Sequence, residues 1–204
     1  MSTALVVGNG PSILNHEFGN LIDSDKWDIV ARFNRWEKDN DGNSHGDYSK
    51  YIGTRCNYWV LNDLHLKKAF KYYNNYDYFL IVCPAFKFNQ YPYKEIETKY
   101  EKIKFLPVEY EEFVNNNIVD FNDKWPSSGI MTLLFMANHF DEVYYHGFDI
   151  YDTSYDKLHY FEDKPNWNKV NKDADKKGSN GHIPQKERIM FEYLKNNYSL
   201  KKLE

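Results

Sequence analysis

A glycine-rich turn near the amino terminus has the composition of a phosphate-contacting loop. The apolar run that ends at Val7 leads into Gly8, Asn9 and Gly10, and a helix is predicted to follow. At the carboxyl end of a strand, glycine allows backbone amides to approach a phosphate group closely. The dinucleotide-binding fingerprint is absent, because Ile13 stands where its third glycine is required. A tight connection that binds no ligand is the alternative.

Polar side chains also stand at the ends of two further predicted elements. Asn34 follows the strand-like run 29–33, where its amide can bind a ligand or simply form a turn. Ser127, Ser128 and Gly129 precede an apolar, helix-like stretch. Their hydroxyl groups and backbone amides can bind a ligand or only cap the helix, and the two roles are compatible.

Two of the seven histidines, His159 and His182, stand in segments suited to acid–base chemistry. The residue before a proline avoids helical geometry, so we expect the chain just before Pro184 to be a loop, with His182 at the start of the last helix. The positive end of that helix would favour a neutral imidazole that can act as a base. His159 is followed by Tyr160, whose hydroxyl is a second hydrogen-bond donor. A structural role in the core or on the surface is the alternative for each histidine.

The elements that would position these residues alternate between strands and helices. Short apolar or aromatic runs predict strands at 5–7, 29–33, 58–61, 79–82, 103–106 and 143–145. Helices are expected at 130–137 and from about Pro184, where Met190, Leu194 and Tyr198 have helical spacing. This alternation is typical of an α/β fold, so we expect residues 1–204 to form a single Rossmann-like nucleotide-binding domain with a mostly parallel sheet. The polar segment 166–181 is interpreted either as a solvated loop or as a lid over a bound ligand.

Bulk properties exclude several classes of protein. The net charge is -4 and no basic stripe is present, so a nucleic-acid partner is not expected despite the many aromatic residues. With only Cys56 and Cys83, a disulfide framework is not expected, and a reducing compartment fits best. No signal peptide or membrane-spanning stretch is recognised, so we expect a soluble protein of a microbial or virus-infected host cytoplasm.

Four motifs in this chain resemble, in order, the sialyl motifs of the eukaryotic-type sialyltransferase family. The long motif is similar to the glycine turn at 6–12 with Ile22-Asp23-Ser24, Arg32-Phe33-Asn34 and Ile52-Gly53-Thr54-Arg55. The short motif is similar to Pro126-Ser127-Ser128-Gly129-Ile130, continuing through Asp141-Glu142-Val143 to Gly147-Phe148. The third motif looks like His159-Tyr160-Phe161-Glu162, and the fourth is matched by His182 and Glu187. The compact chain also resembles bacterial sialyltransferases of the related second family, as a minimal microbial or viral member would.

The resemblance implies an inverting transfer of sialic acid from CMP-sialic acid to a galactoside-type glycan hydroxyl, on a sialyltransferase variant of the GT-A fold. It implies that His182 is the general base and that His159, with Tyr160, stabilises the departing phosphate. Asn9 and Asn34 would bind the phosphate and carboxylate of the donor, and the serine segment its ribose or cytosine. Glu187 is expected to support its helix or the loop that holds His182. The family's disulfide between the long and short motifs has no counterpart, because Ala4-Leu5 and His139-Phe140 replace the expected cysteines.

Metal and cofactor use are predicted to be absent. Asp23-Ser24-Asp25 and Asp173-Ala174-Asp175 both spell a pattern that holds a divalent ion on a pyrophosphate in many sugar transferases. The first falls in the matched long motif and the second in the lysine-rich segment, and a CMP-sugar carries only one phosphate. Protein groups can neutralise the departure of that phosphate without an ion.

Several alternatives stay open. The donor could be CMP-Kdo or another CMP-activated keto sugar acid, or the chain could be a nucleotide-binding module without transfer activity or a methyltransferase-like domain. A lipid-linked acceptor would bring the protein to a membrane surface. Aromatic residues in the middle of the chain are candidates for acceptor contacts, although core packing is the favoured interpretation for Tyr72, Tyr73, Tyr76, Tyr91 and Tyr93.

Overall fold

Seven strands form one parallel sheet in the part of the chain that the structure describes. The computed structural model describes residues 1–34, 36, 48–122, 124–150, 152, 154–155, 159–161 and 182–204. The strands are β1 (Thr3–Val7), β2 (Ile29–Phe33), β3 (Tyr58–Asn62), β4 (Tyr78–Val82), β5 (Ile103–Phe105), β6 (Glu142–His146) and β7 (Leu200–Lys202). Each strand pair runs parallel, in the order β5-β4-β3-β2-β1-β6-β7. The predicted single α/β domain of Rossmann-like class is confirmed.

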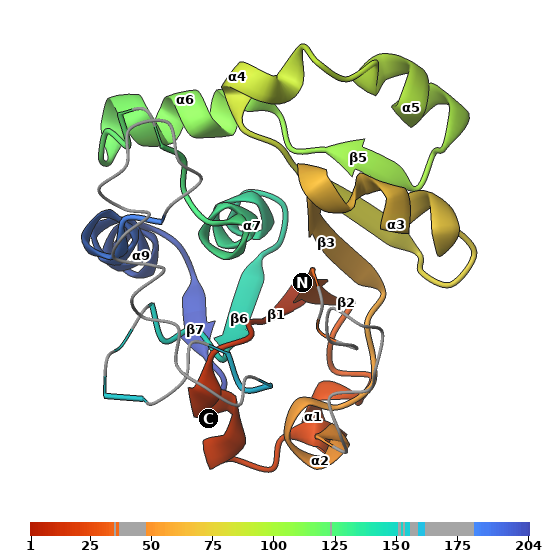
Figure 1. Ribbon diagram of the computed structural model, residues 1–204. Helices are drawn as coiled ribbons and strands as arrows, with labels where there is room; N and C mark the ends of the chain where they lie inside the picture. The colour runs from red at the N-terminus through yellow and green to blue at the C-terminus, as the bar shows by residue number, and fades with distance from the viewer. Residues whose placement is uncertain are drawn as a thin grey trace.

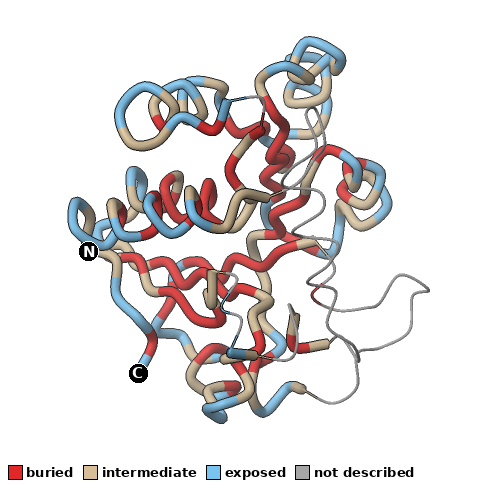
Figure 2. The backbone as a smooth tube through the Cα atoms, turned by 60° about the vertical axis from the view of Figure 1, so that its left-hand side comes forward, coloured by how far each residue is buried: buried red, intermediate tan, exposed pale blue. Residues whose placement is uncertain are grey.

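The central strands β1 and β2 are buried along almost their whole length because both faces of the sheet are covered. Ala4, Leu5, Val6 and Val7 of β1 are all buried, and so is every residue of β2. Continuous apolar runs of this kind are typical of parallel sheets, whereas the strands of a sheet with one solvent-exposed face alternate apolar and polar residues. Figure 2 shows these buried strands at the centre of the molecule, with exposed residues on the surrounding helices.

Helices cover the two faces of the sheet (Figure 1). On one face α6 (Val108–Asn117), α7 (Ser128–Ala137) and α9 (Pro184–Asn197) pack against β1, β2, β3, β4 and β6. The other face carries the 3-10 turn η1 (Pro11–Asn15), α1 (Gly19–Ile22), α2 (Ser49–Ile52), η2 (Asp63–His65), α3 (Leu66–Lys71) and α5 (Tyr93–Lys99). The short helix α4 (Ala85–Phe88) follows β4. A three-layer arrangement results, with one apolar cluster on the face of α6, α7 and α9 and two on the other face.

Both helices that the sequence placed beside the candidate site are present. α7 begins after Ser127, whose hydroxyl accepts a hydrogen bond from the Ile130 amide at 3.4 Å, as expected of a serine cap. α9 begins at Pro184 and buries Met190 and Leu194. His182 lies just before this helix, in the loop that the sequence predicted.

The helix predicted after the turn that follows β1 is present as a 3-10 helix of five residues. β7 was not predicted, because its sequence Leu200-Lys201-Lys202 has no apolar run. The candidate lid at 166–181 lies outside the described residues.

Cys56 and Cys83 are both free thiols. Burial raises the pKa of the Cys83 thiol to about 12, so this side chain behaves as a small apolar residue. None of the helices in the described ranges combines the length and the apolar character needed to cross a membrane.

Candidate active site

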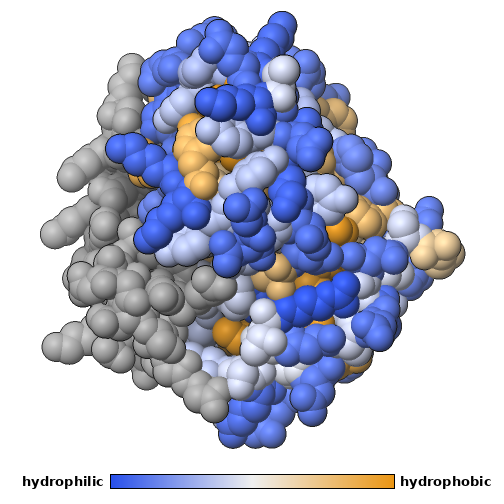
Figure 3. All heavy atoms as spheres, turned by 90° about the vertical axis from the view of Figure 1, so that its right-hand side faces the viewer, coloured by the Kyte–Doolittle hydropathy of each residue, from blue (hydrophilic) through white to orange (hydrophobic). Residues whose placement is uncertain are grey.

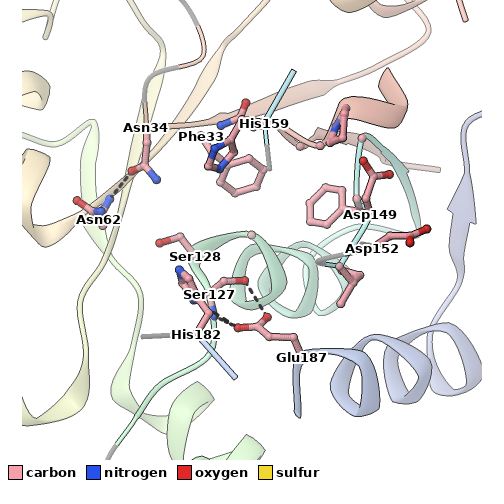
Figure 4. A pocket seen from close by; sticks show the side chains of 18 of the residues that line it. Phe33, Asn34, Asn62, Ser127, Ser128, Asp149, Asp152, His159, His182 and Glu187 are labelled. Atoms are coloured by element: carbon pink, nitrogen blue, oxygen red, sulfur yellow. Dashed lines mark hydrogen bonds and ion pairs between the residues drawn. The ribbon is translucent and has the colours of Figure 1, made fainter. Parts of the chain in front are cut away.

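A pocket opens where the carboxyl ends of four strands meet the start of α7 (Figure 4). β2 lies on one side of β1 and β6 on the other, so the chain leaves the sheet in opposite directions at this point. Open parallel sheets bind ligands at such a switch point. The pocket has a volume of about 320 Å³, and its lining consists of Gly8, Asn9, Gly10, Pro11, Phe33, Asn34, Asn62, Asp63, Leu64, Trp125, Ser127, Ser128, Gly129, Gly147, Phe148, Asp149, Ile150, Asp152, His159, His182 and Glu187. Every predicted site residue except Tyr160 lines it.

The glycine turn after β1 lines the pocket and packs closely against the segment that follows β6. The Gly8 amide donates to the His146 carbonyl at 2.7 Å, and the Gly10 amide donates to the Gly147 carbonyl at 2.8 Å. A methyl group on Gly8 would overlap the carbonyl oxygen of Gly147, and one on Gly10 would overlap the Asp149 carboxylate. Both amides are thus already bonded within the protein, and the contact of Gly8 and Gly10 with a phosphate stays a prediction. Glycine is required here because the turn lies against the segment that follows β6.

Asp149 was not identified from the sequence, although it follows the matched Gly147-Phe148. Its Oδ2 accepts a hydrogen bond from the Ser12 amide at 2.9 Å, which ties the loop after β6 to the turn after β1. Gly147 has a φ of 70°, in the left-handed region, and thereby directs the chain from β6 into this loop. The position of Asp149 three residues after the end of β6 was the available signal.

Asn34 and Asn62 form a second pair of polar side chains at neighbouring strand ends. Asn34 has a φ of 46°, and its Oδ1 accepts a hydrogen bond from the Asn62 backbone amide at 3.0 Å. Its carbonyl accepts from the Trp59 indole at 3.1 Å. Figure 4 shows the Asn34 oxygen turned to Asn62 and the nitrogen turned away from it. The Oδ1 atom of Asn62 is buried and accepts no hydrogen bond from the described residues, so a ligand donor could satisfy it.

The amino terminus of α7 supplies hydroxyl and backbone groups to the pocket. Ser127, Ser128 and Gly129 line it, and the amides of the first helical turn have no partner within the helix. The aligned peptide dipoles make this end of the helix favourable for an oxyanion. These features fit the binding role predicted for the three residues.

A buried carboxylate joins this helix start to His182. Glu187 is 1 % exposed, and its two oxygens accept from the Ser127 amide at 2.6 Å and the Ser127 hydroxyl at 2.8 Å. The same carboxylate lies 3.7 Å from Nδ1 of His182. The expected supporting role of Glu187 thus extends further than its own helix, because it fixes Ser127 and faces the histidine. Figure 4 shows the three side chains together at one side of the pocket.

His159 approaches the pocket from another direction. In Figure 4 it lies beside Phe33, separated from His182 by the open space of the pocket. Its ring is stacked on Phe161 with centroids 5.2 Å apart and planes 2° from parallel. The structure therefore brings two imidazoles to one pocket from segments 23 positions apart in the sequence.

Tyr160 corrects an expectation. It is 1 % exposed, its hydroxyl donates to the Trp36 carbonyl at 2.7 Å, and its amide donates to the Asn9 carbonyl at 2.9 Å. Burial raises the pKa of this phenol well above its usual value. Its side chain is thus buried next to the glycine turn, with its hydroxyl bonded within the protein, and is not directed to a phosphate in the pocket.

The charged side chains in the described lining are carboxylates, and each is bonded. Asp63 accepts from Lys87 at 3.2 Å and from the Tyr91 hydroxyl at 3.3 Å. A hydrogen bond from the Ser154 amide holds the pKa of Asp152 below its ordinary value. Since the described lining includes no lysine or arginine, a bound phosphate would depend there on imidazole, amide and hydroxyl donors.

The residues of the long motif that lie outside the pocket hold the fold together. Asp23 accepts hydrogen bonds from the amides of Thr54 and Arg55, both at 2.7 Å. The buried Arg32 donates to the carbonyls of Arg55 and Ile52. Asp23 is therefore engaged in a structural contact, and Asp173-Ala174-Asp175 lies outside the described residues. Within the described ranges no three histidine, cysteine or acidic side chains gather as metal ligands, and metal independence stays a prediction.

Comparison with known proteins gives structural similarity without sequence similarity. No protein-family profile and no curated protein sequence matches this chain. A solved structure that it resembles is the crystal structure of a mammalian sialyltransferase in complex with Gal-beta-1-3GalNAc-ortho-nitrophenol. The chain shares the fold of that sialyltransferase. The TM-score is 0.61 at 16 % sequence identity, and the match covers 99 % of this chain and 69 % of the sialyltransferase chain.

Proposed function

We propose that this protein is a glycosyltransferase that moves sialic acid from CMP-sialic acid to a hydroxyl group of a galactoside-type glycan. The observation that carries the proposal is the meeting of His159, His182 and the start of α7 in one pocket at the switch point of a sialyltransferase-like fold. A module that only binds nucleotide has no need of two imidazoles beside the ligand. The mammalian structure that the fold resembles holds a galactose-containing disaccharide, which supports the same class of acceptor.

In the proposed reaction His182 accepts the proton of the acceptor hydroxyl. The acceptor oxygen forms a bond to the anomeric carbon of sialic acid as the bond from that carbon to the phosphate oxygen breaks, and CMP leaves with the electron pair. His159 donates a hydrogen bond to the phosphate as its negative charge grows. Attack and departure on opposite faces of the sugar invert the anomeric centre.

Glu187 gives His182 its orientation in this mechanism. With Nδ1 3.7 Å from the carboxylate, Nε2 is the nitrogen that would accept the proton. The Asn34 amide, the Asn62 oxygen and the first turn of α7 supply further contacts for the nucleotide. No metal ion or organic cofactor has a role in the proposal.

A donor screen tests the proposal. CMP release is measured with CMP-sialic acid, CMP-Kdo and UDP-sugars, with a chelator present and with a galactose-containing disaccharide as acceptor. We expect release from CMP-sialic acid, and release from CMP-Kdo alone would transfer the proposal to that donor. Absence of CMP release from every donor would refute it.

Paired histidine variants separate catalysis from binding. His182→Ala should lower turnover by about 10²–10⁴-fold, the usual contribution of a positioned base. Calorimetric titration with CMP should show unchanged affinity for this variant. His159→Ala should lower turnover and also weaken CMP binding, because it contacts the phosphate. If His182→Ala retains full turnover, the assignment of the base is wrong.

A further inference from the structure

Three apolar side chains gather at one side of the pocket and are called the rim cluster here: Leu64, Phe86 and Trp125. Leu64 and Trp125 line the pocket, and the Phe86 ring lies 5.5 Å from the Trp125 ring between centroids. Leu64 is 67 % exposed and Phe86 is 62 % exposed. They come from η2, from α4 and from the segment before α7, so the fold assembles the cluster from three distant parts of the chain.

Among the described residues, three other large apolar side chains are exposed, namely Met1, Tyr78 and Ile189. The face drawn in Figure 3 is largely hydrophilic, with apolar residues only in small separate patches. The tyrosines considered as acceptor contacts from the sequence belong to a packed core between the sheet and the helices α3 and α5. An exposed apolar patch beside a pocket is typical of a ligand-binding surface.

Ion pairs and hydrogen bonds hold the rim cluster in place. Lys87, next to Phe86, is 3.2 Å from the Asp63 carboxylate, and both side chains are largely buried. The Lys87 ammonium lies 5.5 Å from the centroid of the Trp125 ring. The Ala85 amide donates to Glu111 at 2.8 Å, which anchors the start of α4. A surface fixed in advance loses little conformational entropy when it binds a ligand.

The position of the rim cluster suits a second substrate. The pocket volume of about 320 Å³ is at the lower end of the range for small-molecule sites, so a nucleotide sugar leaves little space for an acceptor inside it. Trp125 stands two residues before Ser127, whose partner Glu187 faces His182. The rim cluster is therefore connected through Trp125 to the helix start whose Ser127 shares Glu187 with the proposed base.

We propose that the rim cluster is the acceptor subsite and takes the apolar face of a β-galactoside ring. The axial hydroxyl of galactose leaves three C–H groups on one face of the ring, and such a face packs well on aromatic and aliphatic side chains. The opposite, polar side of the sugar would extend toward His182. The orientation of a sugar hydroxyl toward His182 rests on the proposed function. The binding of the sugar to the rim cluster does not, and it can be tested separately.

The test compares exposed side chains inside and outside the rim cluster. Phe86→Ser and Leu64→Ser alter largely exposed positions, and Tyr78→Ser is the matched control, since Tyr78 is 48 % exposed at the opposite end of the sheet. With Gal-β1,3-GalNAc as acceptor, Phe86→Ser should raise the acceptor KM by about tenfold, the effect of one aromatic contact. The Kd for CMP should change by less than about twofold, and Tyr78→Ser should leave both constants unchanged.

The outcomes separate this inference from the proposed function. An unchanged acceptor KM in both rim variants, or an equal change in Tyr78→Ser, overturns it. If the wild-type protein releases no CMP, saturation-transfer NMR with methyl β-D-galactopyranoside replaces the kinetic assay. Contact to the galactoside that is lost in Phe86→Ser supports the subsite even then, and no contact in the wild-type protein overturns it.

Discussion

Replacement of Glu187 by glutamine tests the connection between Ser127 and His182. The carboxylate is 1 % exposed and accepts two hydrogen bonds from Ser127. Charge-assisted hydrogen bonds contribute about 1.5–3 kcal/mol each and neutral ones about 0.5–1.5 kcal/mol, so Glu187→Gln should lower the free energy of unfolding by about 2 kcal/mol. For a chain of this length that loss corresponds to a fall in Tm of about 4–8 °C.

The same substitution should also change turnover. Glutamine keeps the shape of the side chain but removes the charge that faces His182 Nδ1 at 3.7 Å. Turnover should fall by about 100-fold, the size expected when a reacting group is misplaced by about 1 Å. Thermal unfolding followed by circular dichroism gives the Tm, and CMP release per folded molecule gives the turnover.

Glu192→Gln is the matched control on the same helix. Glu192 is exposed and pairs with Lys195 at 2.9 Å, a surface contact that contributes about 1 kcal/mol or less. This variant should keep its turnover and nearly all of its Tm. A Tm for Glu187→Gln equal to that of Glu192→Gln would refute the buried contact. A lowered Tm with full turnover would refute the orientation of His182.

Four further substitutions test other parts of the structure. Burial lowers the pKa of His146 to about 4, below the value of about 6.5 for an unfolded chain, so the unfolded state binds the proton more readily. The free energy of unfolding should therefore fall by up to about 3 kcal/mol as the pH drops from 6.5 to 4. His146→Leu should flatten this decline in denaturant unfolding curves measured between pH 7 and pH 5, and an unaltered slope would contradict the buried neutral state. Gly8→Ala should lower the free energy of unfolding by about 1–3 kcal/mol through overlap with the Gly147 carbonyl. Gly129→Ala should have a smaller effect in the same measurement, because the nearest atom to its methyl group would be in the Phe148 ring at 3.2 Å. Tyr160→Phe should lower the free energy of unfolding by about 1–3 kcal/mol, because the Trp36 carbonyl loses its donor, while CMP release per folded molecule is retained. A loss of turnover without destabilisation would instead support a phosphate-binding role for this hydroxyl.

Local sequence patterns were sufficient for most of the sheet and for the helices beside the site. Strands of a covered parallel sheet have short apolar runs, so β1, β2, β3, β4, β5 and β6 were all located from these runs. Ser127 and Pro184 marked the starts of α7 and α9 because capping depends on nearby residues. β7 was missed, since its pairing with β6 depends on the tertiary fold and not on its own sequence.

The site residues were predicted better than their interactions. The resemblance to the sialyl motifs selected the residues that meet in the pocket, but Glu187 bonds Ser127 across 60 positions and Asp149 bonds Ser12 across 137. Contacts of that range are set by the packing of whole elements, which a sequence pattern does not encode. For the same reason Gly8 and Tyr160 were assigned to a ligand, although their bonding groups are used within the protein.

The outermost strands of the sheet, β5 and β7, have only three residues each. A strand of a second molecule that paired with β7 would have to desolvate the exposed side chains of Lys201 and Lys202, and β5 presents the exposed Lys104. Short, lysine-bearing edges of this kind oppose sheet extension between molecules. Aggregation through edge-to-edge pairing should therefore be rare in concentrated preparations, and the long apolar strands that carry the site stay shielded in the interior of the sheet.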